Sequence, residues 1–160
     1  MTGVDAALFR QLLGRFATGV TVITTRNAAG EPEGMTASSV ASVSLEPPLL
    51  LVSVDHKNVM HQALAKASHF IVNVLAADQE AISRRFAELE NNRFDGVRYH
   101  TGKLGLPILD GVLAHIECTK HSAVDAGDHT VYLGLVTGGS VTDGPPLLYY
   151  RGGYANLSGS

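Results

Sequence analysis

The sequence has little of the residues that build disulfides and large aromatic clusters. It contains one cysteine, Cys118, no tryptophan, and 6% aromatic residues in total. A single cysteine excludes a disulfide within the chain, which is typical of proteins in the reducing cytoplasm. We therefore expect a cytoplasmic protein in which Cys118 is a small core residue.

Long apolar runs and an excess of basic residues are also missing. The apolar runs are far shorter than the roughly 20 residues that a membrane-spanning helix needs. Lys and Arg number 12 against 15 Asp and Glu, so the formal net charge is -3 at pH 7. The chain offers no basic field, and we expect neither nucleic acid nor membrane among its partners. With 45% hydrophobic and 17% charged residues, its 160 residues suit one folded domain over residues 1–160.

Motifs of several common enzymes are absent as well. No G-x-G-x-x-G follows a predicted strand, which argues against a separate Rossmann dinucleotide site, and no G-x-S-x-G marks a nucleophilic serine. Among the 7 histidines, His56 and His61 lie five positions apart and miss the one-turn helical spacing with which two imidazoles share an ion. We expect structural histidines and no metal site.

The most unusual segment that is present spans residues 34–53, whose first half carries only small side chains. Between residues 36 and 44 no side chain is larger than valine, and five bear hydroxyls: Thr36, Ser38, Ser39, Ser42 and Ser44. This composition favours one extended strand with Thr36, Ser38, Val40, Ser42 and Ser44 on one face. A strand this thin leaves room for a flat ligand against its backbone. The alternative is a plain solvent-facing strand.

An apolar strand and a helix start follow this segment. Residues 49–54 read LLLVSV, which predicts a buried strand, and the polar residues DHKN at 55–58 predict a turn. Asn58 is a good N-cap for a helix whose apolar stripe comprises Val59, Met60, Ala63, Leu64 and Ala67. Because a helix N-terminus attracts anions, we expect an anion site there with Lys57 beside it.

The rest of the chain alternates short helices with strands. We expect a packed amphipathic helix capped by Asp5, with Leu8, Phe9, Leu12, Leu13 and Phe16 on its apolar side. Strands are predicted over residues 19–25, 69–75, 113–124 and 130–142, the last two joined as a hairpin. Asp78 is expected to cap a helix with Ile82, Phe86 and Leu89 on one face. Residues 91–106 lack periodicity, and we expect an excursion that borders a pocket.

Seven motifs in order along the chain carry a family resemblance. They read RFATGVTVI at 15–23, GMTASS at 34–39, SVSLEPPL at 42–49, NVL at 73–75, RFA at 85–87, GDH at 127–129 and YYRGGY at 149–154. As a set they resemble the short-chain flavin reductases, the reductase partners of two-component flavin monooxygenases. The resemblance implies a mostly β fold with short helices, a split β-barrel of Greek-key-like antiparallel strands. It also implies a homodimer that passes hydride from NADH or NADPH to flavin and supplies reduced flavin to a monooxygenase.

The resemblance also implies which residues bind the two cofactors. Flavin, as FMN or FAD, would contact Thr36, Ala37, Ser38, Ser39, Ser53, Val54, Asp55, Lys57, Asn58, Arg85 and Phe86. The nicotinamide nucleotide would contact His129, Arg151 and Tyr154. No side chain is expected to be catalytic, because hydride passes directly between cofactors held roughly 3–3.5 Å apart.

Several alternatives stay open at this point. Arg85 could be a solvated helix charge, Phe86 a core residue, and His129 a histidine that caps the hairpin through Asp128. Asn58 stands where many family members have Ser or Thr, which leaves the choice between FMN and FAD open. The protein could also be a flavin-binding electron carrier without enzymatic activity, or an oxidoreductase similar to pyridoxamine-phosphate oxidase.

Overall fold

The computed structural model describes residues 2–88 and 90–158. The helices in this part of the chain are α1 (Ala6–Leu13), α2 (Val59–Lys66) and α3 (Glu80–Glu88). The strands are β1 (Thr18–Gly19), β2 (Thr21–Arg26), β3 (Pro32–Ala37), β4 (Val40–Leu45), β5 (Pro48–Asp55), β6 (His69–Val74), β7 (Tyr99–Thr101), β8 (Pro107–Leu109), β9 (Ala114–Ala126), β10 (His129–Val141), β11 (Leu148–Tyr150) and β12 (Gly153–Ala155).

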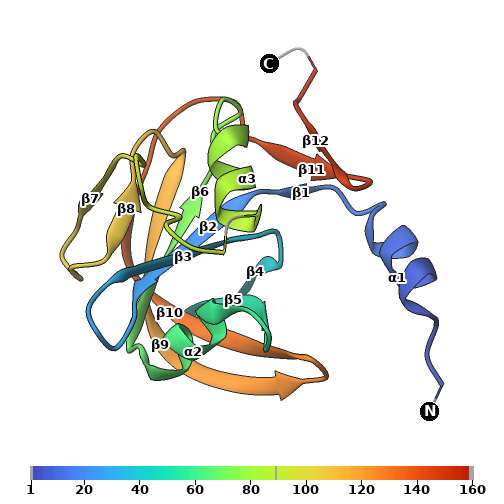
Figure 1. Cartoon of the computed structure of the whole chain (residues 1–160), viewed down its shortest axis with the longest axis horizontal. Coiled ribbons are helices and arrows are strands. Elements are labelled where there is room, and N and C mark those ends of the chain that lie inside the picture. The colour runs from blue at the N-terminus through green and yellow to red at the C-terminus, as the bar shows by residue number, and fades with distance from the viewer. Residues whose placement is uncertain (1, 89, 159–160) are drawn as a thin grey trace.

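One large antiparallel sheet forms the body of the molecule (Figure 1). Its strand order is β3-β2-β6-β9-β10-β5-β4, and smaller sheets join β1-β11-β12 and β7-β8. Helix α3 packs on β3, and α2 contacts β2, β3 and β5. The predicted mostly β, antiparallel fold with short helices is thus confirmed. The helices in the described residues do not combine the length and apolar character that crossing a bilayer requires.

The long hairpin of β9 and β10 follows the prediction closely. Its turn consists of Gly127, which adopts a φ of 67°, and Asp128. At the start of β10, His129 pairs with Ala126 on β9 and with Asp55 on β5. The Gly-Asp-His motif therefore lies beside the end of β5, where the chain turns into α2.

Strand β5 and helix α2 also form where they were expected. Leu50, Val52 and Val54 alternate into the main core, as a half-buried strand requires. Asn58 Oδ1 accepts a hydrogen bond from Met60 N at 2.9 Å and caps α2. Met60 on this helix is fully buried, whereas Val59, predicted for the same stripe, is 51% exposed.

The prediction of a single thin strand over residues 36–44 is wrong. The chain breaks at Ser38 and Ser39, so that β3 and β4 lie at opposite edges of the large sheet. A register shift between Ser42 and Ser44 interrupts the expected alternation again. The break separates two pairings, since β3 pairs with β2 whereas β4 pairs with β5. Hydroxyl composition predicted extended backbone but could not predict this change of partner.

The prediction that the N-terminal helix packs on the protein is wrong for the single chain. Asp5 caps α1 as expected, because its Oδ1 accepts from Leu8 N at 2.8 Å. All eight residues of α1 are nevertheless exposed, and Phe9 and Leu12 are each 55% exposed. Figure 1 shows this helix standing beside the sheet rather than on it. Its apolar face thus lacks a partner among the described residues.

The segment from residue 76 to residue 109 differs in detail from the prediction. Helix α3 begins at Glu80. The residue before it is Gln79, whose side chain accepts a hydrogen bond from Ala76 N at 2.9 Å. The predicted cap, Asp78, lies one residue before Gln79. Leu89, expected on the apolar face of this helix, lies outside the described residues. The excursion over residues 91–106 contains the short strand β7, which pairs with β8.

Candidate functional site

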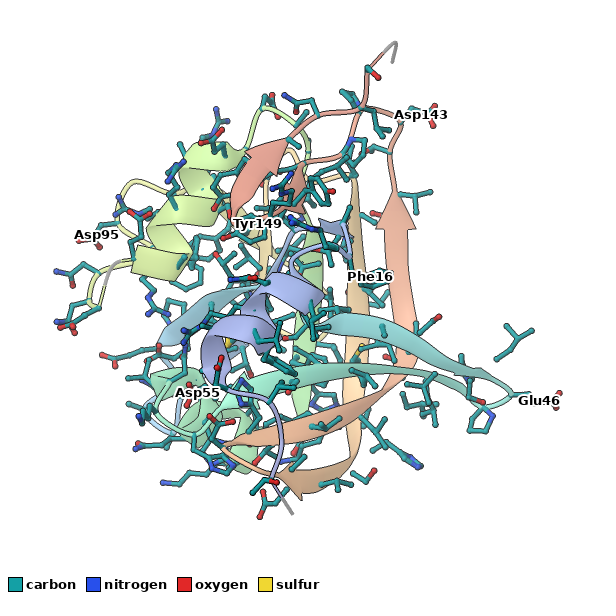
Figure 2. All side chains as sticks on the ribbon, turned by 90° about the vertical axis from the view of Figure 1, so that its right-hand side faces the viewer. Phe16, Glu46, Asp55, Asp95, Asp143 and Tyr149 are labelled. Carbon is teal, nitrogen blue, oxygen red and sulfur yellow. The ribbon has the colours of Figure 1, made fainter. Side chains whose placement is uncertain are left out.

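Two adjoining hollows lie on either side of Tyr149 on β11, the first bordered by α3 and β3 and the second by α1 and the β11–β12 turn. The first, of about 230 Å³, is lined by Val20, Thr36, Ser38, Ser83, Ala87, Tyr149 and Tyr154. The second, of about 310 Å³, is lined by Phe9, Arg10, Leu13, Gly14, Phe16, Thr18, Ser38, Tyr149, Tyr150, Arg151 and Gly152. Ser38 and Tyr149 belong to both, so the hollows form one crevice. Figure 2 shows Phe16 and Tyr149 on the same side of the molecule, close to α1.

Ser83 on α3 links residues predicted for the two different cofactors. Thr36 Oγ1 donates to Ser83 O at 2.6 Å, and Ser83 Oγ lies 2.7 Å from the Tyr154 hydroxyl. The Arg84 guanidinium lies 4.8 Å from the centre of the Tyr154 ring, on its face. The structure thus brings Thr36 and Ser38, predicted for flavin, together with Tyr154, predicted for nicotinamide.

The break between β3 and β4 is joined to β5 by two hydrogen bonds. Ser39 Oγ donates to Ser53 O at 2.8 Å, and Ser53 N donates to Ser39 O at 3.1 Å. Two predicted flavin positions are therefore neighbours. The side chains of Ala37 and Val54 point into the core, with 4% and 0% exposure, so only their backbone groups could meet a ligand.

The turn before α2 is less open to an anion than the sequence suggested. Asp55 Oδ1 accepts from Lys57 N at 2.8 Å, Asn58 N donates to Asp55 O at 3.0 Å, and the Asn58 side chain already binds Met60 N. The chain itself therefore occupies three of the amide groups, and the Asp55 carboxylate adds negative charge. The helix dipole and the exposed Lys57 side chain remain to attract a phosphate.

His129 lies apart from the other two residues predicted for nicotinamide. Its Nδ1 lies 2.7 Å from Asp128 Oδ1, and this hydrogen bond and the nearby imidazole lower the pKa of Asp128. The capping contact with Asp128, one of the two alternatives, is therefore present. Arg151 instead occupies the β11–β12 turn with a φ of 53°, and Figure 1 shows that turn well away from the β9–β10 turn.

Arg85 and Phe86 have structural contacts in this chain. Arg85 donates to the backbone carbonyls of Arg93 at 2.6 Å and Asn92 at 3.0 Å, and to that of Asp95, so it is not a freely solvated charge. Phe86 is 1% exposed and packs edge-on against Phe94 at 5.0 Å. The Phe86 side chain thus has almost no surface to offer a ligand.

Two histidines lie closer together than their spacing suggested. The rings of His56 and His61 have centroids 4.9 Å apart because His56 lies in the turn before α2 and not on the helix. Even so, no group of three His, Cys, Asp or Glu side chains in residues 2–88 and 90–158 has a metal-binding arrangement.

The sequence prediction missed several residues of the crevice, among them Ser83 and Tyr149. Ser83 is fully buried, three positions before Phe86, and a polar residue on the predicted apolar face of α3 was the available signal. Tyr149 lines both hollows and belongs to the YYRGGY motif, from which only Arg151 and Tyr154 were selected.

The donors in and beside the crevice suit a polar aromatic ligand. Thr18 Oγ1 is buried and has no hydrogen-bond partner among the described residues, and Thr18 lines the second hollow. The exposed Ser38 hydroxyl and the two tyrosines add polar and stacking contacts. These residues fit a flavin or nicotinamide ring, whose edges carry hydrogen-bonding groups.

Comparison with known proteins adds independent information. Residues 13–158 match the family model described as flavin reductase like domain. The FMN reductase (NADH) SmoA of Agrobacterium fabrum is 42% identical over 156 residues, covering 98% of this chain and 88% of that protein. The monooxygenase reductase subunit HsaB of Mycobacterium tuberculosis is 41% identical over 159 residues, covering 96% of this chain and 83% of that protein.

A solved structure extends the comparison to three dimensions. The NADH:FAD oxidoreductase SgcE6 of Streptomyces globisporus, in complex with NAD and FAD fragments, superposes with a TM-score of 0.92 at 38% identity. The match covers 99% of this chain and 98% of that one. Sequence and fold agree, and the chain belongs to the flavin reductase like domain family.

Proposed function

We propose that this chain is an NADH-dependent flavin reductase that supplies reduced FMN or FAD to a flavin-dependent monooxygenase. The observation that carries the proposal is the match to this family over residues 13–158, with relatives named as NADH-dependent flavin reductases. The reaction is NADH + flavin + H⁺ → NAD⁺ + reduced flavin, in which hydride moves between the two ligands. The protein then needs only to bind and orient them.

The residues in and around the crevice have distinct proposed roles. Ser38 is exposed between the two hollows and would contact the edge of the flavin ring, while Thr36 and Ser39 hold the surrounding backbone through their bonds to Ser83 and Ser53. Lys57 at the start of α2 would neutralise phosphate. Tyr154 and Arg151 would face the nicotinamide nucleotide, the first by stacking and the second by pairing with phosphate.

We also propose a homodimer, supported by the apolar surface that a single chain leaves open. Leu8, Phe9, Leu12 and Leu13 of α1 are between 43% and 55% exposed, and Phe16 is 74% exposed. Figure 2 shows Glu46 at the tip of the β4–β5 hairpin, and Leu45, the residue before it in the sequence, is 91% exposed. A second copy could cover these side chains, and it could also add contacts to the crevice that α1 borders.

The whole chain acts as one domain in this proposal, and it acts in the cytoplasm. A cytoplasmic location is supported by the lone thiol, since Cys118 is free and fully buried. The comparison also favours the reductase over the other oxidoreductase considered, because the named relatives are flavin reductases.

A turnover assay tests the proposed activity. Purified protein is mixed with free FMN, FAD or riboflavin in large molar excess, together with NADH or NADPH, and nicotinamide absorbance is followed. We expect many turnovers with NADH and saturation with added flavin. A protein that holds flavin yet does not oxidise NADH would instead be an electron carrier, and the proposal would fail.

The homodimer needs its own test, with a matched control on the same helix. We expect sedimentation at micromolar concentration to show a dimer for the unmodified chain and a monomer for Leu12→Glu. Gln11→Glu, one position away and also exposed, should stay dimeric. A monomeric unmodified chain with full activity would overturn the dimer.

A further inference from the structure

The histidine in the turn between β5 and α2 joins two segments that are distant in the sequence. His56 N donates to Asp128 O at 3.0 Å, and His56 Nε2 lies 3.0 Å from Thr130 Oγ1. Asp128 in turn holds the His129 ring through its carboxylate. His56 therefore ties the turn over residues 55–58 to the turn that presents His129.

The hydrogen-bond directions at this contact are determined by its chemistry. Thr130 Oγ1 donates its one hydrogen to Asp125 Oδ1 at 2.7 Å, because an aspartate carboxylate only accepts. The Thr130 oxygen must therefore accept from His56, so that Nε2 of His56 carries a hydrogen. Thr130 is 3% exposed, whereas the His56 side chain is 39% exposed, so this bond joins a buried residue to one at the surface.

The other side of the His56 ring is supported by α2 and β10. His61 lies beside it with 4.9 Å between ring centroids, and His61 Nδ1 is 2.9 Å from the hydroxyl of Tyr132. Tyr132 is 1% exposed, so this support is anchored in the core. The His56 imidazole is thus held from two directions, although part of it remains at the surface.

We propose that His56 is a positioning residue that sets the turn carrying His129 against the turn at the start of α2, and thereby tunes binding of the nicotinamide nucleotide. This inference rests on the proposed function and on the nicotinamide role that the family resemblance implies for His129. Removing the imidazole leaves the backbone bond to Asp128 in place. The pairing of β10 with β5 and β9 should therefore stay, while the Thr130 side chain loses its contact with His56.

Four variants test the side-chain contact directly. We expect His56→Ala and Thr130→Val each to raise the KM for NADH about fivefold, the equivalent of one hydrogen bond, with kcat and the flavin Kd changed less than about twofold. Their double variant should be no worse than Thr130→Val alone, because Thr130→Val already removes the bond to His56 together with the bond to Asp125. His56→Gln keeps an N–H donor near the position of Nε2 and should restore most of the affinity. His121→Ala, an exposed histidine on β9, is the control and should leave KM unchanged.

The outcomes distinguish a failure of the positioning role of His56 from a failure of the nicotinamide role of His129. An unchanged KM in His56→Ala, or additive effects in the double variant, overturns the positioning role while His129→Ala still raises KM. If His129→Ala has no effect either, the nicotinamide role of His129 fails and the inference fails with it. Thermal unfolding is measured for every variant, so that a raised KM is attributed to positioning only in variants that stay folded at the assay temperature.

Discussion

Ser39 and Ser53 exchange two hydrogen bonds across the point where β3 gives way to β4. One runs from Ser39 Oγ to Ser53 O at 2.8 Å and the other from Ser53 N to Ser39 O at 3.1 Å. The Ser39 hydroxyl is thus used by the fold itself. Ser38, one residue earlier, is exposed and lines both hollows of the crevice.

The first prediction therefore concerns Ser38. Ser38→Leu should weaken flavin binding by at least about tenfold, because the added side chain would fill the crevice without entering the core. Ser38→Ala, which only removes the hydroxyl, should cost less. Flavin Kd is measured by fluorescence quenching, and unchanged affinity in a folded Ser38→Leu protein would show that flavin binds elsewhere.

A second prediction concerns the hydrogen bond between Ser83 and Tyr154. Ser83 is fully buried, so Tyr154→Phe leaves its hydroxyl without this partner and should lower the free energy of unfolding by about 1 kcal/mol. Ser83→Ala should cost a similar amount. The double variant should cost less than the two single changes together, as urea titrations of all three proteins will reveal; strict additivity would argue against a direct bond.

A third prediction uses the close approach of Gly34 to Phe86. A Cβ added at Gly34 would lie 2.7 Å from Phe86 Cε1 and 3.3 Å from Phe94 Cζ. Because these rings are packed together, Gly34→Ala should cost about 1–3 kcal/mol of stability. Gly19→Ala, at a strand glycine with no atom within 4 Å of the added carbon, is the matched control and should be nearly neutral. Equal melting temperatures for the two variants would contradict the packing.

A fourth prediction follows from the buried thiol. Burial raises the pKa of Cys118 from 9.0 to about 12. Above pH 9 the unfolded state loses the thiol proton while the folded state retains it, so stability falls as pH rises from about 9 towards 12. The expected slope for this one group is about 1.4 kcal/mol per pH unit.

Cys118→Ala isolates that contribution. Burial also raises the pKa of Tyr132, with Asp125 adding to the effect, so the unmodified chain should lose stability through both groups. In the variant only the Tyr132 part of the alkaline loss should remain, and urea titrations between pH 8 and pH 11 would show it. Identical pH profiles for the two proteins would exclude a titrating Cys118.

The sequence predicted those features that depend on local chemistry. The Asp5 and Asn58 caps and the β9–β10 hairpin formed as expected, because each depends on residues close together in the chain. The break at Ser38 and Ser39 could not be predicted in this way, because it depends on which distant strands β3 and β4 join. The exposure of α1 could not be predicted either, since amphipathic spacing predicts an apolar face but not what covers it.

The candidate site was predicted in part from the sequence. The motifs located Thr36, Ser38 and Tyr154, and the fold brings these residues into one crevice. Ser83, which joins them, was missed because a single buried serine on a helix has no distinctive sequence pattern. Phe86 is the opposite case, a motif residue whose side chain is almost completely buried in the core.

Hydride transfer to a diffusing flavin is the central claim, and an anaerobic titration tests it most directly. Protein at a small fraction of the flavin concentration is mixed with FMN or FAD, and NADH is added stepwise while flavin and nicotinamide absorbance are both recorded. We predict that the whole flavin pool is reduced, with one NADH oxidised for each flavin. Bleaching that stops at one flavin per protein, or no bleaching, would contradict the account.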